Sequence, residues 1–325
     1  MPLRMITTTE LMARTLDATI DPVAIDAALV AVRQAADAIC DRWSLTLVLA
    51  MMRGERTFGG LMTATGMASR LLTARLRSLE RTGIVMRMPY SVRPLRHDYH
   101  LTNKGESIFG PILHMLRWEQ THGGGSRRGI AAIRHVPCNR LLKPELRCGA
   151  CLEAVTARDI ALKVSRASTQ HTPARRTSHR RSIVNSCDHA AVRQMLGPSL
   201  DIFGDKWGIE ILVCAFFRVR RFGEFRDRTG ISANILSDRL ERLTAAGVLS
   251  AGGRGEAEPG YRLTNKGIDL YGVIVSIEAW ADAWIGDRYR SPVRLIHRGC
   301  GAVFHPVTVC AHCSTVARRM DIAFT

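Results

Sequence analysis

The sequence lacks several features that would place it in a common functional class. Its longest apolar runs, Leu45–Met52 and Ile209–Phe217, fall well short of the ~20 residues that a membrane-spanning helix needs. The N-terminal residues lack the positively charged start and apolar core of a secretory signal peptide. The chain also lacks a Gly-rich phosphate loop and a His-Glu metalloprotease motif. We therefore expect a cytoplasmic protein that is neither a membrane protein nor an enzyme.

Acidic residues are scarce relative to basic ones. The 325 residues include 46 Lys and Arg but only 29 Asp and Glu, a formal net charge of +17. Such a surplus favours a polyanionic partner, with nucleic acid ahead of an anionic membrane. The nine cysteines, without an export signal, indicate a reducing compartment in which they act as thiols or metal ligands. Two of them, Cys40 and Cys214, lie in apolar segments and are expected in the core.

One stretch of the chain occurs twice, from Trp43 to Gly105 and again from Trp207 to Gly267. Matching residues recur at a constant interval as far as Gly83 and Gly247, after which the second copy is two residues shorter. The loss falls between Val85 and Tyr99, where a surface hairpin would tolerate it. The chain is therefore a duplicated domain, and its length allows two domains of roughly 100–150 residues, each with its own core.

Apolar spacing predicts four helices, a two-stranded wing and a final helix in each copy. In the first copy we expect an Ala-rich helix from Val23 to Ile39, then one over Leu45–Met52, then a short helix that ends at Gly66. A fourth helix, with leucines along one face, begins with Ser69 as its N-cap and ends at Gly83.

The wing follows this fourth helix. Short strands are predicted at Ile84–Met88 and Asp98–Leu101, on either side of a polar hairpin tip, and Thr102 is expected to cap the last helix. This order is that of a winged helix. The predicted fold is mainly α with small β-wings: two tandem winged helix-turn-helix domains, each followed by a small Cys/His tail that resembles a zinc knuckle. The expected division is an N-terminal arm over 1–22, winged-helix domains over 23–122 and 187–286, Cys/His tails over 130–160 and 292–325, and a flexible basic linker over 161–186.

Several short motifs carry a family resemblance. They are Asp41-Arg-Trp43, Gly204-Asp-Lys-Trp207, Arg221-Phe-Gly-Glu-Phe225, Gly247-Val-Leu249 and Tyr261-Arg-Leu-Thr264. In this order both halves resemble the HxlR-type winged helix-turn-helix regulators, a bacterial transcription-factor family, over about 30–120 and 190–285. The resemblance implies DNA binding, with recognition helices at about 68–82 and 232–246.

The chain departs from the family pattern at three points. Cys40 stands where the family usually has Gly, and the second copy lacks the Pro-Tyr wing tip. Oxidant-sensing members carry a cysteine shortly before the Gly-Asp-Lys-Trp motif, but Cys187 lies too far from it. Redox sensing is therefore not carried over to this chain.

Polar residues on the recognition helices and wing are the candidate DNA contacts, because a helix fits the major groove and reads base edges there. From the first copy we expect contacts by Ser69, Arg70, Thr73, Arg75, Arg77, Arg93 and Arg96, and from the second by Ser232, Asn234, Ser237 and Arg239. The first recognition helix is basic, whereas Asp238 and Glu241 make the second one neutral. We therefore expect the first copy to supply more phosphate affinity. For any single arginine, an ordinary solvated charge is an equally good interpretation.

A second recurring pattern follows each final helix. Four residues repeat with the same types and spacing: His135, Cys138, Cys148 and Cys151 in the first tail, and His297, Cys300, Cys310 and Cys313 in the second. Two ligand pairs at this spacing suit a closed tetrahedral Cys3His zinc site in each tail. The chain is therefore expected to hold two structural zinc ions. Simple reduced cysteines and Cys-x-x-Cys redox disulfides are the alternatives.

These patterns favour a sequence-specific, nucleoid-associated regulator of transcription that binds double-stranded DNA, with repression expected over activation. Tandem domains can imitate the two-fold dimer that reads a palindrome, so a monomeric pseudo-dimer or a homodimer would serve. No small-molecule effector can be read from the sequence. A zinc- or thiol-dependent redox protein, and a winged helix used only for protein contacts, remain the alternatives.

Overall fold

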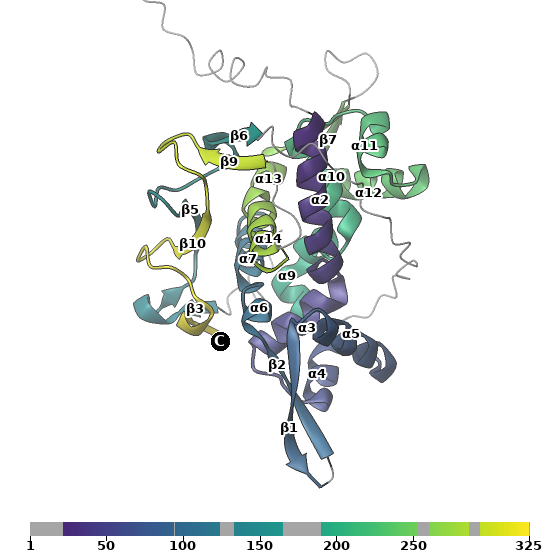
Figure 1. Cartoon of the computed structure of the whole chain (residues 1–325), viewed down its shortest axis with the longest axis vertical. Coiled ribbons are helices and arrows are strands. Elements are labelled where there is room, and N and C mark those ends of the chain that lie inside the picture. The colour runs from purple at the N-terminus through teal and green to yellow at the C-terminus, as the bar shows by residue number, and fades with distance from the viewer. Residues whose placement is uncertain are drawn as a thin grey trace, which may run out of the picture.

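Two winged helix-turn-helix repeats follow each other in the chain, and the computed structural model describes residues 22–93, 95–123, 133–164, 190–252, 260–285 and 293–324 (Figure 1). The first repeat contains α2 (Pro22–Ile39), α3 (Arg42–Met52), α4 (Phe58–Thr65), α5 (Ser69–Arg81), β1 (Val85–Val92), β2 (Leu95–Leu101), α6 (Asn103–Glu106) and α7 (Phe109–His122). The second contains α9 (Ala190–Phe203), α10 (Lys206–Phe216), α11 (Phe222–Thr229), α12 (Ala233–Ala245), β7 (Leu249–Gly252), β8 (Gly260–Leu263), α13 (Asn265–Ile268) and α14 (Tyr271–Trp284). The element order predicted from the sequence is therefore confirmed.

The two repeats exchange their first helices. Helix α2 of the first repeat packs on α10 of the second, and α9 of the second packs on α3 of the first. The final helices α7 and α14 also pack against each other, so the main hydrophobic core runs continuously through both repeats. These helices thus form one interface between the two repeats of a single chain. None of the described helices is both long enough and apolar enough to cross a membrane.

Helix boundaries show where local prediction was wrong. Ala68, not Ser69, is the N-cap of α5, and it makes no side-chain capping bond. Thr102 does accept a hydrogen bond from the Gly105 N–H, but it caps the short helix α6, which precedes α7. Gly83 follows the helix with a φ of 71°, the left-handed conformation expected of a residue just past a helix end.

The first wing is longer than predicted. Strands β1 and β2 run into the expected hairpin tip and pair from Val85–Leu101 to Val92–Leu95, with an irregularity in register between Pro89 and Ser91. The two strands therefore stay paired through the segment where the prolines had predicted a hairpin tip. The predicted linker also begins too early, because Ala161–Val164 belongs to a strand of the first tail. The N-terminal arm and the remainder of the predicted linker lie outside the described residues.

The two Cys/His tails form one module. The first contributes β3 (Ile133–His135), β4 (Arg140–Leu141), β5 (Pro144–Cys148) and β6 (Ile160–Val164), and the second β9 (Val293–His297), β10 (Pro306–Cys310) and β11 (Ile322–Phe324). All the tail-to-tail pairings are antiparallel: β5 with β10, β6 with β9, and β11 with β3. Each pairing therefore joins a strand of one tail to a strand of the other, and neither tail is an independent knuckle.

A pseudo-two-fold axis relates the repeats. In the β5–β10 pair, Pro144 faces Cys310 and Cys148 faces Pro306, so equivalent residues change places across the central pair Leu146 and Thr308. The same relation maps the pairing of β6 with β9 onto that of β11 with β3. The chain is thus built as a symmetric dimer would be, with an isologous contact between its two halves.

Candidate nucleic-acid interface and metal centres

Both helix-turn-helix turns are built in the same way. The Thr65 hydroxyl donates to the Leu61 carbonyl at 2.6 Å and accepts from the Met67 N–H at 3.4 Å. Gly66 then supplies the left-handed backbone that ends α4, with a φ of 57°. Thr229 and Gly230 repeat this arrangement after α11. The Thr-Gly pairs of the sequence therefore set the angle at which each recognition helix leaves the turn.

Helix α5 presents unpaired basic residues to solvent. Its leucines, Leu72, Leu76 and Leu79, are buried, while Ser69, Arg70 and Arg77 on other faces are exposed. Neither of these arginines forms an ion pair with any residue that the structure describes. The Thr73 hydroxyl donates to the Ser69 carbonyl at 2.8 Å, so the Thr73 oxygen is free only to accept a hydrogen bond.

The equivalent face of α12 is neutralised from within. Ser232, Asn234 and Ser237 are exposed, as their predicted role requires. Asp238, however, pairs with Arg242 at 3.1 Å and also contacts Arg239. An arginine already held by a carboxylate offers little to a phosphate, and the exposed Glu241 adds no cation, so this helix presents polar groups without a free positive charge.

Two arginines predicted as DNA contacts form ion pairs within the fold. Arg75 lies 3.0 Å from Asp41, and Arg239 contacts Asp205 at the equivalent place in the second repeat. Both arginines are largely buried, with 30% and 23% of their side chains exposed. The aspartates come from the Asp-Arg-Trp and Asp-Lys-Trp motifs, so these motifs tie the recognition helices α5 and α12 to the N-termini of α3 and α10. In this structure Arg75 and Arg239 are therefore both engaged by carboxylates of their own repeat.

The first wing carries both cations and exposed apolar side chains. Arg93 and Arg96 near its tip are exposed. Along β1, Met86, Met88, Tyr90 and Val92 are also exposed, Val92 by 82%. The wing extends away from the body of the molecule (Figure 1). Such a hairpin can reach along a duplex to a neighbouring groove or backbone segment.

The eight predicted metal ligands form two groups, but not the two expected. One group joins His135 and Cys138 of the first tail to Cys310 and Cys313 of the second, and the other joins Cys148 and Cys151 to His297 and Cys300. In each group the ligand atoms all lie within 4.8 Å of one another. The expectation of one complete quartet per tail was wrong, because antiparallel pairing of β5 with β10 brings the Cys-x-x-Cys half of one tail beside the His-x-x-Cys half of the other.

The donor geometry fits a tetrahedral zinc ion. Sulfur–sulfur distances are 3.9 Å for Cys138–Cys310 and for Cys148–Cys300. The His135 Nδ1 lies 3.3 Å from the Cys138 Sγ and 3.4 Å from the Cys313 Sγ. A tetrahedron with Zn–S bonds of ~2.3 Å has sulfur–sulfur edges of ~3.8 Å, with slightly shorter edges to nitrogen. A disulfide would need sulfurs ~2.05 Å apart, and all eight described cysteines are free thiols.

The other two described cysteines belong to the core, as predicted. Cys40 and Cys214 are 4% and 0% exposed. Burial raises the pKa of the Cys214 thiol to about 12 and also raises that of Cys40. Both therefore stay protonated and are poor candidates for metal ligands or nucleophiles.

Contacts across the pseudo-axis also hold the repeats together, and sequence reasoning missed them. The Trp118 indole donates to the Lys266 carbonyl at 2.8 Å, and the Trp280 indole donates to the Lys104 carbonyl at 3.1 Å. Each lysine ammonium also lies over the ring of its tryptophan partner, at 4.9 Å and 5.5 Å. The Thr-Asn-Lys-Gly motif after each wing is thus fixed to the final helix of the opposite repeat.

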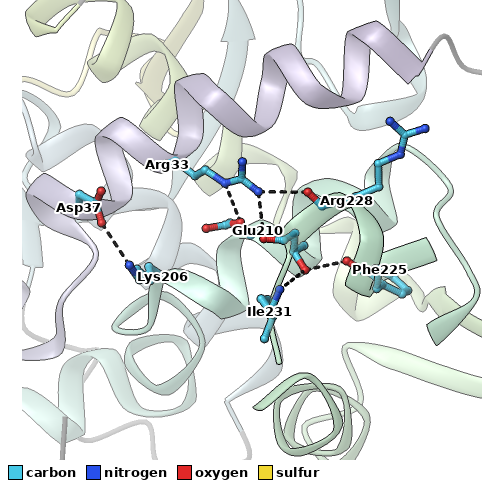
Figure 2. Close-up of polar contacts among 8 residues, drawn as sticks. Arg33, Asp37, Lys206, Glu210, Phe225, Arg228 and Ile231 are labelled. Carbon is cyan, nitrogen blue, oxygen red and sulfur yellow. Dashed lines mark hydrogen bonds and ion pairs between the residues drawn. The ribbon is translucent and has the colours of Figure 1, made fainter. Parts of the chain in front are cut away.

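The contacts that Arg33 makes with the other repeat are not symmetric (Figure 2). Arg33 of α2 pairs with buried Glu210 of α10 at 2.8 Å, and its guanidinium also donates to the carbonyls of Arg228 and Thr229 in α11. At the equivalent places in the other half stand Gly197 and Thr46, which cannot form an ion pair. Only the second helix-turn-helix unit is therefore clamped to the other repeat in this way.

The fold and this interface define a tandem winged helix-turn-helix protein. The family model of the HxlR-like helix-turn-helix matches residues 38–126 and 202–289, more than half of the chain, so the protein belongs to that family. The uncharacterized HTH-type transcriptional regulators Mb3122 of Mycobacterium bovis and Rv3095 of Mycobacterium tuberculosis are each 33% identical over 129 residues, which cover 40% of this chain and 82% of the relative. The solved Pseudomonas aeruginosa transcription-factor candidate PA1374 is 22% identical, with a TM-score of 0.33, over 43% of this chain and 94% of that chain.

Proposed function

We propose that this protein is a sequence-specific DNA-binding transcriptional regulator, and a repressor rather than an activator. The observation that carries the proposal is the pair of exposed, unpaired arginines on α5, Arg70 and Arg77. They stand where a recognition helix meets the major groove, and arginine can grip guanine edges or phosphates there. Membership of a helix-turn-helix family, and relatives named as transcriptional regulators, support the same function.

Both recognition helices lie on the side of the molecule away from the Cys/His module (Figure 1). A single chain can thus present two readers to one duplex, as a dimeric regulator does. Because α5 is basic and α12 nearly neutral, the proposed operator is asymmetric, and the half-site under α5 contributes more electrostatic affinity. Arg93 and Arg96 of the wing would add backbone contacts beside that half-site.

A matched pair of double variants tests the proposal. Genomic DNA fragments captured by the wild-type protein would be titrated at fixed salt with Arg70→Ala/Arg77→Ala and with Asn234→Ala/Ser237→Ala. We expect the arginine pair to lose about tenfold in affinity per arginine. The slope of log affinity against log salt should also decrease by about one for each phosphate contact removed.

Two results would count against this reading. Equal losses in the two variants would remove the asymmetry, and no salt-dependent binding by the wild type would remove the DNA-binding function. Repression is tested separately: deleting the gene should raise the transcripts of the bound promoters.

We also propose that each Cys3His group holds one structural Zn2+. The donors are the soft thiolates and imidazole that zinc prefers, and four protein ligands close the coordination shell, leaving no open position for catalysis. When bound, zinc would supply cross-links that a module with a small apolar core otherwise lacks. Metal analysis of the purified protein should give two zinc ions per chain, and a fully folded protein free of metal would contradict the proposal.

A further inference from the structure

We infer that the two metal centres act as clasps between the repeats, so that zinc occupancy holds the two helix-turn-helix units in one fixed arrangement. The inference rests on the proposed zinc sites and adds their role. Each group takes one histidine and one cysteine from one tail and a Cys-x-x-Cys pair from the other. A bound ion therefore joins the end of one repeat to the end of the other, and neither tail can complete a site alone.

The strands around the ligands make the same cross-connections. Cys148 and Cys310 end β5 and β10, which pair across the pseudo-axis, and each of these cysteines belongs to a different metal group. His135 lies on β3 beside β11, and His297 lies on β9 beside β6, again with strands of opposite tails. Losing the metal would therefore loosen three sheets that all join the repeats.

The module has little apolar core of its own. Leu146, Cys148, Val155, Val275 and Phe304 form a separate buried cluster, and one of these five is itself a ligand. In the other half of the module, Ile133, Leu142, Cys310, Ala317 and Ile322 pack into the main core. The separate cluster is too small to offer much free energy to offset the ordering of the strands around it, and metal binding commonly supplies the rest in modules of this size. The half of the module around Cys148 is thus the part of the interface most dependent on zinc.

The module is also connected to the helices that carry the DNA-binding units. Burial lowers the pKa of His114 on α7 to about 3, so the ring is neutral, and its Nε2 lies 2.9 Å from the Thr308 hydroxyl on β10. Arg117, on the same helix, donates to the Pro144 carbonyl at 2.8 Å. Helices α7 and α14 hold Trp118 and Trp280, which bind the segments directly after the two wings. A continuous set of contacts therefore runs from the ligands to both wings.

Metal stoichiometry in two matched double variants tests the shared ligand sets directly. His135→Ala/Cys310→Ala removes two ligands from one proposed site, and His135→Ala/Cys148→Ala removes one ligand from each. Both variants lose one histidine and one fully buried cysteine from equivalent strands. We expect one zinc ion per chain in the first variant and essentially none in the second.

The opposite pattern, one ion retained only by His135→Ala/Cys148→Ala, would show that each tail binds zinc by itself and would overturn the clasp. Absence of zinc from the wild type would overturn the clasp together with the zinc proposal. Neither result depends on DNA, so failure here is distinct from failure of the proposed regulatory function.

Hydrogen exchange on the wild-type chain then tests the effect on the interface without any substitution. Chelation should increase exchange at least tenfold for backbone amides in β5 and β10, and added Zn2+ should restore protection. Amides of α3 and α10, inside the main core, serve as the internal reference and should change less. Unchanged exchange in β5 and β10 after complete zinc removal would overturn the clasp.

Discussion

The two helix-turn-helix units share one frame but differ on their outer faces. Inside, the same Thr-Gly turn and the same aspartate–arginine pair fix each recognition helix. Outside, α5 offers free arginines, whereas Asp238 occupies the arginines of α12. The second unit alone is clamped by Arg33. The contacts that fix each recognition helix within its own repeat therefore follow the pseudo-symmetry. The charges on the DNA-facing surfaces and the clamp that holds one unit do not.

Removing the Arg33 clamp, which only the second unit has, is expected to cause the largest change in stability. Arg33→Ala leaves Glu210, which is 3% exposed, without its cation, while the lost guanidinium is itself 32% exposed. We expect a loss of about 3 kcal/mol in unfolding free energy, the low end of the range for an uncompensated buried charge. Urea unfolding measures it. The control is Arg226→Ala, because its partner Asp227 is 70% exposed and can remain hydrated, so at most about 1 kcal/mol is expected.

The pH dependence of the same variant sharpens the test. Burial raises the pKa of Glu210, and Arg33 works against that rise. A carboxyl group whose pKa is raised in the folded protein binds protons more readily in the folded state than in the unfolded state. Its contribution to stability therefore falls as the pH rises above the ordinary pKa of the group, about 4.5. Without Arg33 the pKa rises further. The variant should therefore lose stability between pH 5 and 8 more steeply than the wild type, and parallel pH profiles would argue against the clamp.

The charge difference between the recognition helices gives the next effect. Asp238→Asn should release Arg242 and partly release Arg239, which stays bound to Asp205. We expect about a tenfold gain in DNA affinity and a steeper salt dependence, because one further cation can meet a phosphate. Glu145→Gln is the matched control, since it frees Arg147 in the Cys/His module, away from the recognition helices. Equal gains would show a general effect of net charge rather than a contact on α12.

The sequence alone predicted the elements and their order, because helix periodicity, Gly punctuation and the duplication are local signals. It also predicted which eight residues make up the two Cys/His groups. It could not predict how they divide, since the spacing within a tail is equally compatible with a complete site and with two halves. The division depends on strand pairing between tails that are far apart in the chain. Likewise, nothing near Arg75 in sequence shows that Asp41 lies beside it.

The aspartates that start α3 and α10 provide the smallest contrast between the repeats. Asp41 accepts hydrogen bonds from the Ser44 N–H at 3.0 Å and the Ser44 hydroxyl at 2.8 Å, in addition to its pair with Arg75. Asp205 has Gly208 in place of that serine and makes no capping bond. Asp41→Ala should therefore destabilise the protein by about 1 kcal/mol more than Asp205→Ala, the usual worth of an N-cap. Urea unfolding of the two variants decides the matter: an equal loss would assign both aspartates only to the recognition-helix arginines, with no contribution from the cap.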